Sequence, residues 1–348
     1  MASSFITISD FSFRFIILTF EFMKRLFILF ILLMSVNAFA QSVSTEKMTV
    51  DVNELALKVI CKQLYLAKKD ADKEKYNQQL LQKFQEVLKE SNSFENYHFD
   101  SLHKDIGILV SADNKFRIIN WNVPKEDGTQ EYYGFIQEHY TTTLKKGLFK
   151  REHIDSVQLY QLIDKSAEIK NPENAVTDNK KWFGALYNKI IIKKTKAKTY
   201  YTLLAWDGND KFSRKKIIDV LTFDANGTPR FGADIFNMQK KYPKRVIFEY
   251  SANCNISVRY SAKKDSIVFD HLAPTSPQLE GQFQYYCSDG SYDGFGFKKG
   301  KWNYGMYVNA TNEKDELDKL YGDPHDKSIG NSESIKYIDP NKKKKKPH

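Results

Sequence analysis

The loop containing Trp206, Asp207, Asn209 and Asp210 has the side chains of a ligand site. It follows an apolar run, and its carboxylate and amide oxygens surround Gly208. Such oxygens are the ligands that Ca²⁺ takes in proteins. The same residue types are common in tight turns, because their side chains hydrogen-bond the local backbone. We therefore interpret this loop either as a turn or as an ion or ligand site.

A second loop, after Cys287, repeats this combination with Asp289, Tyr292 and Asp293. Neither loop has the alternating acids and the distal Glu of the helix-loop-helix calcium motif. Ca²⁺ is therefore only an alternative at these loops. The sequence predicts no metal site and no cofactor.

Aromatic residues make up 14% of the chain, and several lie in or beside these loops. Exposed Trp and Tyr rings stack on sugars, so a glycan is one candidate partner and another envelope protein is the alternative. The candidate rings are Trp182, Trp206, Tyr285, Tyr286, Tyr292 and Trp302. Core packing is the competing interpretation, because aromatic rings are favoured in strands and supply much of their buried area.

Recognisable catalytic motifs are missing from the sequence. It has no G-x-S-x-G nucleophile elbow. His98 and His103 are five residues apart, whereas two metal ligands on one helical face need a spacing of three or four. The segment from Gly294 to Gly300 lacks the last glycine of a G-x-G-x-x-G loop and predicts a hairpin. A carboxylate pair remains an alternative, because it needs proximity in space rather than in sequence.

The three cysteines predict one disulfide. Cys254 and Cys287 both lie in the strand-rich C-terminal part, so we expect them to pair in an oxidising compartment. Cys61 lies in an apolar helical stretch and is expected to be a buried thiol.

The formal net charge of +10 does not by itself indicate nucleic-acid binding. Five positive charges come from lysines 342–346. Elsewhere Lys is mixed with Asp and Glu, whereas a nucleic-acid interface needs its cations on one folded face. We therefore expect no nucleic-acid partner. Residues 323–348 predict a disordered Lys-rich tail, with a surface-charge anchor as the alternative.

Residues 23–40 have the order of features of a secretory signal. A Lys-Arg pair precedes a short apolar run, and Ala38-Phe39-Ala40 forms a cleavage box. The run is shorter than the roughly 20 residues of a membrane span, so we expect no span in the mature chain. Residues 1–22 are interpreted as a misassigned or non-native extension before a start at Met23. The cleavage box and the Lys/Asn-rich body resemble envelope proteins of Gram-negative bacteria, and this resemblance covers the signal only.

The apolar periodicity predicts a helical hairpin over residues 51–91. Asp51 is the expected N-cap, and the first helix is expected to bury Val52, Leu55, Ala56, Val59 and Ile60. In the second helix the expected buried face contains Tyr76, Leu80, Phe84, Val87 and Leu88.

Residues 106–310 predict a series of strands joined by short turns. Turns are expected at residues 113–114, 127–128, 207–210 and 224–227, and residues 154–169 fit either a helix or a strand. The predicted fold class is α+β, with the helical hairpin packed on a mainly antiparallel meander. A sandwich, a barrel and a propeller-like sheet all remain open.

These patterns predict one globular domain over residues 41–322 in a soluble protein of the periplasm, the cell envelope or the extracellular space. The first hypothesis for its function is a non-enzymatic binding or structural module. The alternative is an enzyme that acts on cell-wall or extracellular polysaccharide with a carboxylate pair. An enzyme needs a perturbed titratable pair in a cleft, and a glycan-binding module needs an exposed aromatic ring.

Overall fold

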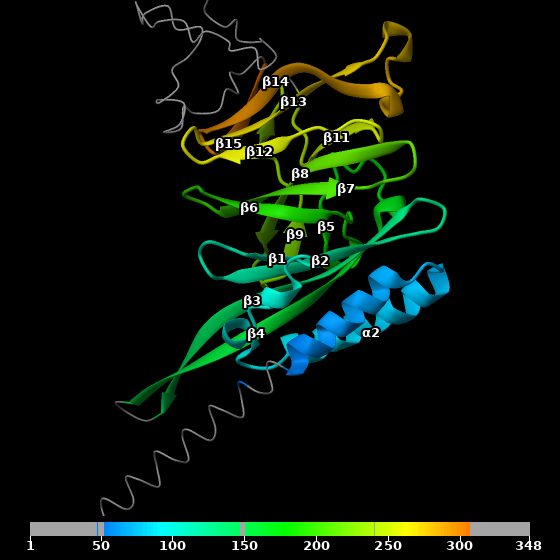
Figure 1. Ribbon diagram of the computed structural model, residues 1–348. Helices are drawn as coiled ribbons and strands as arrows, with labels where there is room; N and C mark the ends of the chain where they lie inside the picture. The colour runs from blue at the N-terminus through cyan, green and yellow to red at the C-terminus, as the bar shows by residue number, and fades with distance from the viewer. Residues whose placement is uncertain (1–46, 48–51, 147–149, 240, 307–348) are drawn as a thin grey trace, which may run out of the picture. The chain divides into compact units, whose positions relative to one another are not determined.

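A computed structural model describes residue 47 and residues 52–146, 150–239 and 241–306 (Figure 1). The predictions for residues 1–22, for the signal at 23–40, for the Asp51 cap and for the tail at 323–348 lie outside this part of the chain. The described residues all belong to one compact unit.

The predicted helical hairpin is present. Residues 52–66 form its first helix, and α2 spans Asp70–Leu88. The expected face of α2 is confirmed, since Leu80, Phe84, Val87 and Leu88 are fully buried.

The expected face of the first helix is wrong at three of its five residues, whereas Ile60 packs against the core as expected. Val52, Leu55 and Val59 are 60%, 61% and 50% exposed. The helix instead buries a neighbouring stripe that contains Leu57 and Cys61. Both stripes have helical spacing, so periodicity alone could not choose between them.

The first sheet has four antiparallel strands in the order β1-β2-β3-β4. Its strands are β1 Gly107–Val110, β2 Phe116–Pro124, β3 Gln130–Lys146 and β4 Lys150–Ile163. The helical hairpin covers one face of this sheet (Figure 1). At this contact the rings of Phe84 and Trp121 stack at 5.4 Å between centroids, and the Trp121 Nε1–H donates to Asn77 Oδ1 at 2.8 Å. Short helical turns, α3 Ser93–Asn96 and η1 Asp100–Leu102, connect the hairpin to β1.

The second sheet follows the order β5-β9-β8-β7-β6. Strand β8 pairs with β7 along one edge; along its other edge it pairs with β11 through residues 213–218 and with β9 through residues 221–223. Its strands are β5 Thr177–Asp178, β6 Leu186–Lys194, β7 Thr199–Asp207, β8 Ser213–Phe223, β9 Pro229–Phe231 and β11 Val246–Ser251.

The third sheet has the order β10-β15-β14-β13-β12. Its strands are β10 Phe236–Asn237, β12 Val258–Ser261, β13 Ser266–Pro274, β14 Tyr286–Lys298 and β15 Lys301–Gly305. All of its pairings are antiparallel except that of β10 with β15.

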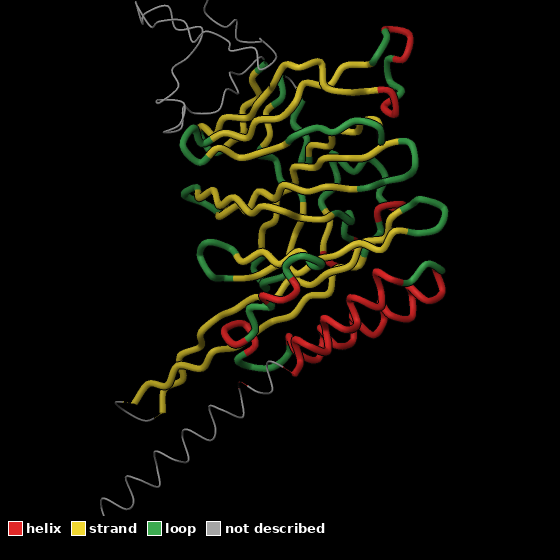
Figure 2. The backbone as a smooth tube through the Cα atoms, viewed as in Figure 1, coloured by secondary structure: helices red, strands yellow, loops and turns green. Residues whose placement is uncertain are grey.

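The three sheets are stacked face to face (Figure 2). Leu203 of β7 packs toward the first sheet, and its neighbour Leu204 packs toward the third. Successive strand residues point to opposite faces, so the middle sheet is buried on both sides. The fold class is therefore α+β, as predicted. The sheets pack as in a sandwich, with three layers of strands instead of two.

The series of strands is interrupted by 3-10 helices and by one glycine with a positive φ. Residues 154–169 form a strand up to Ile163, followed by the 3-10 helix η2, Ser166–Glu168. Gly232, whose φ is +90°, separates β9 from β10. The 3-10 helix η5, Phe283–Tyr285, directly precedes β14. The hairpin expected near Gly300 is confirmed between β14 and β15.

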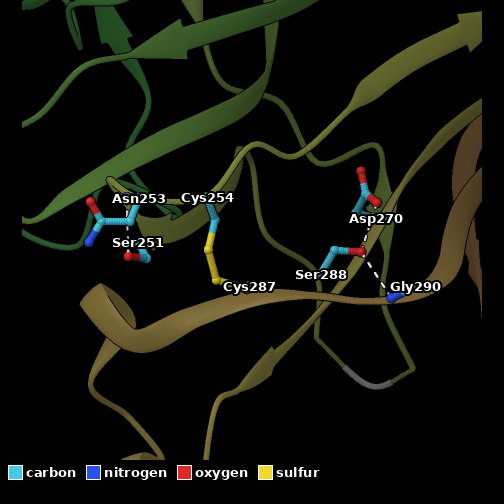
Figure 3. The surroundings of a disulfide bond; sticks show 7 residues. All are labelled: Ser251, Asn253, Cys254, Asp270, Cys287, Ser288 and Gly290. Atoms are coloured by element: carbon cyan, nitrogen blue, oxygen red, sulfur yellow. Dashed lines mark hydrogen bonds between the residues drawn. A yellow bond between two sulfur atoms is a disulfide. The ribbon is translucent and has the colours of Figure 1, made fainter.

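The predicted disulfide joins Cys254 and Cys287, whose Cα atoms lie 5.9 Å apart (Figure 3). Cys254 follows β11 in a turn closed by its N–H to the Ser251 carbonyl, and Cys287 lies near the start of β14. The bond therefore links the second sheet to the third. Cys61 is a buried free thiol, as expected.

Candidate functional site

A cleft of about 580 Å³ lies where the end of β7 meets the start of β3 and the segment after β4. We call it the acidic cleft. Side chains from all three sheets or their connections line it, and those used below are Tyr132, Asp164, Glu173, Asp207, Lys215, Glu249 and Phe283.

Three charged residues form a row across adjacent strands in this cleft. Asp207 of β7 is the register partner of Lys215 of β8, which is in turn the partner of Glu249 of β11. Directly opposed residues of neighbouring strands project from the same face of a sheet. The Lys215 ammonium lies 3.7 Å from Asp207 Oδ2. The row therefore places one cation between two carboxylates.

Asp207 is buried, and its hydrogen bonds come from two directions. Its Oδ1 accepts the Tyr132 hydroxyl at 2.7 Å and the Asn209 backbone N–H at 2.7 Å. Burial raises the pKa of this carboxyl, and the negative charge of Asp164 acts in the same direction. The two hydrogen bonds and Lys215 oppose the rise. Asp207 therefore binds a proton more readily than an exposed aspartate does.

Tyr132 connects the first sheet to the Asp207 turn. Its hydroxyl oxygen accepts a hydrogen bond from the Gly208 N–H at 2.7 Å, and the hydroxyl group donates a hydrogen bond to Asp207. A β-carbon at Gly208 would lie 2.8 Å from side-chain atoms of both Gln130 and Trp206. Glycine at this position therefore allows the turn to pack closely against these two side chains. This contact fixes the end of β7 against the first sheet.

Asp164, the second carboxylate of the cleft, follows β4. Its Oδ1 accepts hydrogen bonds from the Ser166 N–H at 2.9 Å and the Ser166 hydroxyl at 2.6 Å. Its Oδ2 accepts the Tyr132 backbone N–H at 3.3 Å. Asp164 and Asp207 are thus linked through the two ends of one tyrosine.

The cleft combines an excess of negative charge with exposed apolar surface. Asp164, Glu173, Asp207 and Glu249 contribute four carboxylates, and Lys215 is the cation among the lining residues. Phe283, from the β13–β14 connection, is 47% exposed at the same cleft. The disulfide at Cys287 ties the base of that connection to the second sheet.

The first predicted loop contributes two of its four residues to the cleft. Asp207 and Asn209 line it. Asp210 closes the turn, since its Oδ1 accepts the backbone N–H groups of Phe212 and Ser213. Trp206 lines a different hollow, of about 320 Å³. The turn interpretation is confirmed for this loop by the contacts of Asp207 and Asp210 with the local backbone. The site interpretation stays a prediction.

The second predicted loop is not part of the acidic cleft. Asp289 accepts the Ser291 N–H at 2.9 Å, which is a local turn contact. The Asp293 carboxylate is buried and hydrogen-bonds Nδ1 of His271 at 2.8 Å and the Tyr304 hydroxyl at 2.5 Å. The Arg259 guanidinium lies 5.5 Å from the centre of the Tyr292 ring. None of Asp289, Tyr292 and Asp293 lines the acidic cleft.

Trp302 does not provide an exposed stacking surface. Its ring is fully buried, and its Nε1–H donates to Thr202 at 3.0 Å in the core between the second and third sheets. Trp182 is fully buried as well. Both tryptophans therefore pack in the core, which confirms the competing interpretation for these two residues.

Most residues of the cleft were not identified from the sequence. Tyr132, Asp164, Lys215, Glu249 and Phe283 come from separate segments between residues 130 and 283. No single motif contains two of them, and their proximity depends on the stacking of the sheets. Only the turn at Asp207 could be recognised from neighbouring residues in the sequence.

Among the residues that the structure describes, no three His, Cys, Asp or Glu side chains gather as a metal site. Calcium binding at either loop therefore rests on loop composition alone. No helix in the described ranges has the length and hydropathy of a membrane span.

The chain matches no protein-family model. No curated protein and no solved structure is significantly similar to it. Function is therefore inferred from the residues of the cleft themselves.

Proposed function

We propose that this protein is an exported, non-catalytic carbohydrate-binding module whose ligand occupies the acidic cleft. Export is supported by the signal-like order of residues 23–40 and by the disulfide, since such bonds persist in oxidising compartments. A periplasmic or extracellular location follows from the same proposal.

The observation that carries the binding proposal is the exposed Phe283 ring beside the row of Asp207, Lys215 and Glu249. Carboxylates accept hydrogen bonds from sugar hydroxyls, and an ammonium group donates to them. An aromatic ring covers the apolar face of a sugar. Small-molecule sites usually combine apolar surface with a few fixed polar groups in this way.

The charge of the cleft selects the class of sugar. Four carboxylates against one lysine disfavour a ligand that carries phosphate, sulfate or carboxylate groups. A neutral oligosaccharide or one with free amino groups suits the cleft.

An array of neutral, amino and acidic oligosaccharides tests this proposal with the full-length protein. Retention of neutral or amino sugars at physiological salt is the expected result. The Phe283→Ala variant should lose most of that retention, whereas Phe212→Ala should keep it, because Phe212 is exposed but does not line the cleft. Failure of every neutral and amino sugar to bind would exclude the proposal.

A second candidate function is hydrolysis of a polysaccharide, and the raised pKa of Asp207 favours it. A general acid must hold its proton near the working pH, and burial moves Asp207 in that direction. Asp164 would be the partner carboxylate. Release of reducing ends from a bound oligosaccharide, abolished by Asp207→Asn and by Asp164→Asn, would establish this function in place of simple binding.

A further inference from the structure

Strand β7 has the acidic cleft at one end and a group of lysines at the other. Three turns meet at the lysine end: the β6–β7 turn, the β12–β13 turn and the β14–β15 turn (Figure 1). They carry eight exposed lysines, which we call the lysine surface: Lys194, Lys196, Lys198, Lys263, Lys264, Lys298, Lys299 and Lys301.

Specific contacts hold these turns together. Lys193 of β6 is buried and forms an ion pair with Asp265 of the β12–β13 turn. A β-carbon at Gly300, at the tip of the β14–β15 turn, would lie 3.3 Å from Thr195 of the β6–β7 turn. The lysines are therefore gathered on one region of the folded chain, although they lie in three separate segments of the sequence.

The lysine surface surrounds a hollow. A cavity of about 700 Å³ is lined by Lys264, Lys298, Lys299 and Lys301, together with Asp265, Gly296, Phe297 and Asn303. Asp265, the acidic residue of the three turns, is already held by Lys193 and by the Tyr260 hydroxyl at 2.7 Å. Within the described ranges, no carboxylate forms an ion pair with Lys298, Lys299 or Lys301.

The kind of anion is indicated by what surrounds these lysines. The cavity is larger than a single free phosphate or sulfate requires, and its cations are lysines, which bind anions as separate point charges. The ammonium group of Lys193 lies 5.0 Å from the Phe297 ring centre, 5.1 Å from that of Trp302 and 5.4 Å from that of Tyr260. These rings are packed around an internal cation and do not form the row of exposed stacking surfaces that single-stranded nucleic acids use.

A membrane surface fits less well than a polymer chain. The turns end in small residues, Ala197, Ala262 and Gly300, so no large apolar side chain at the tips can enter a headgroup layer. The lysines line a concave region, which a chain can enter and a flat bilayer cannot.

We propose that the lysine surface binds an acidic polysaccharide, a chain of sugars that carries sulfate, carboxylate or phosphate groups. This second site goes beyond the acidic cleft and selects the opposite ligand charge. Two sites of opposite charge at the two ends of β7 would let one module contact neutral and acidic chains at once.

The test measures the affinity of the full chain for fluorescein-labelled heparin, a sulfated polysaccharide probe, in 0.15 M NaCl. The variant Lys298→Gln, Lys299→Asn, Lys301→Gln removes three charges from the cavity, and Asn is used at 299 because φ is +54° there. The matched control is Lys58→Gln, Lys62→Gln, Lys89→Gln, which removes three exposed charges from the helical hairpin. Lysines 342–346 are present in both variants, so their effect cancels.

The cavity variant should bind heparin about tenfold more weakly, and the control should change the affinity less than twofold. Heparin binding by the unaltered protein should weaken steeply with added salt, and neutral dextran should not compete.

Equal losses in both variants would overturn the proposal, because net charge alone would then explain the binding. Tighter binding to a single-stranded RNA or to phosphatidylserine vesicles than to heparin would assign the surface to those partners instead. Phe283→Ala should leave heparin binding unchanged, so the two sites are tested separately.

Discussion

Tyr132 and Asp207 are joined by a hydrogen bond of 2.7 Å, although 75 residues separate them and they belong to different sheets. The bond does two things at once. It closes the contact between the first two sheets at the end of β7, and it holds a buried carboxylate in the acidic cleft. The stability of the fold and the properties of the cleft are therefore coupled at this pair.

Replacing Tyr132 with Phe should lower the free energy of unfolding by about 1–3 kcal/mol. The change leaves the buried Gly208 N–H without its acceptor and removes one donor from Asp207. Urea unfolding at pH 7 measures the effect. Tyr242→Phe is the control, because Tyr242 is 57% exposed and its change should alter stability by less than about 0.5 kcal/mol. Equal stability of the two variants would show that the Tyr132 hydroxyl is not required.

Replacing Asp207 with Asn should raise the free energy of unfolding at pH 7. Burial raises the folded-state pKa of Asp207, so its ionisation in the native state costs stability as the pH rises above the unfolded value. Asn keeps an oxygen that accepts hydrogen bonds from Tyr132 and Asn209, but it carries no charge. The difference from the unaltered protein should shrink as the pH falls toward about 4. A loss of stability at pH 7 would mean that the attraction to Lys215 outweighs burial.

Glu138 should make the protein less stable as the pH rises from about 4.5 to about 7. Burial raises the pKa of this β3 carboxyl from 4.5 to about 7, against the effects of Tyr160 and Lys115. The native state then binds more protons than the unfolded state within that range, so stability falls with pH. The melting temperature of Glu138→Gln should depend less on pH between 5 and 7. Parallel curves for the variant and the unaltered protein would contradict this account.

Removing the disulfide with Cys254→Ser, Cys287→Ser should lower the free energy of unfolding by about 3–4 kcal/mol. The bond closes a segment with a sequence separation of 33 residues, and such cross-links restrict the unfolded chain. The disulfide also anchors the connection that carries Phe283, so the double variant should retain less sugar than the unaltered protein.

Alkylation of the thiols provides a direct check on the disulfide. Without reductant, a native sample should react at none of the three cysteines. Cys61 is protected because burial removes it from solvent and raises its pKa to about 12. Labelling of Cys254 or Cys287 in unreduced protein would show that the bond is not formed.

The sequence predicted those features that depend on local patterning. Turn residues and alternating apolar residues located most strands, and the face of α2 was read correctly from Leu80 to Leu88. The face of the first helix was not, because Val52, Leu55 and Val59 satisfy the same periodicity as the residues that are buried. Which stripe packs inward depends on the sheet beneath, and this information is not local.

The acidic cleft and the lysine surface likewise combine residues that local patterns identify with residues that only the packing of the sheets brings together. Asp207 was recognised in its turn, but Tyr132, Asp164 and Glu249 reach it only because the strands pair and the sheets stack. The lysines mixed with acids along the sequence become one surface when three turns meet, as the contact of Lys193 with Asp265 shows. A count of charges along a sequence therefore could not reveal either the acidic cleft or the lysine surface.

The affinity of the sugar retained on the array, measured for two matched aspartate variants, tests the central claim most directly. Asp207→Asn alters the acidic cleft, whereas Asp289→Asn makes the same change in a similar turn contact of the third sheet, outside the cleft. Titration calorimetry should show at least about tenfold weaker binding for Asp207→Asn, consistent with loss of a charge-assisted hydrogen bond, and unchanged binding for Asp289→Asn. Unchanged affinity for Asp207→Asn, or an equal loss in both variants, would contradict a binding role for the cleft.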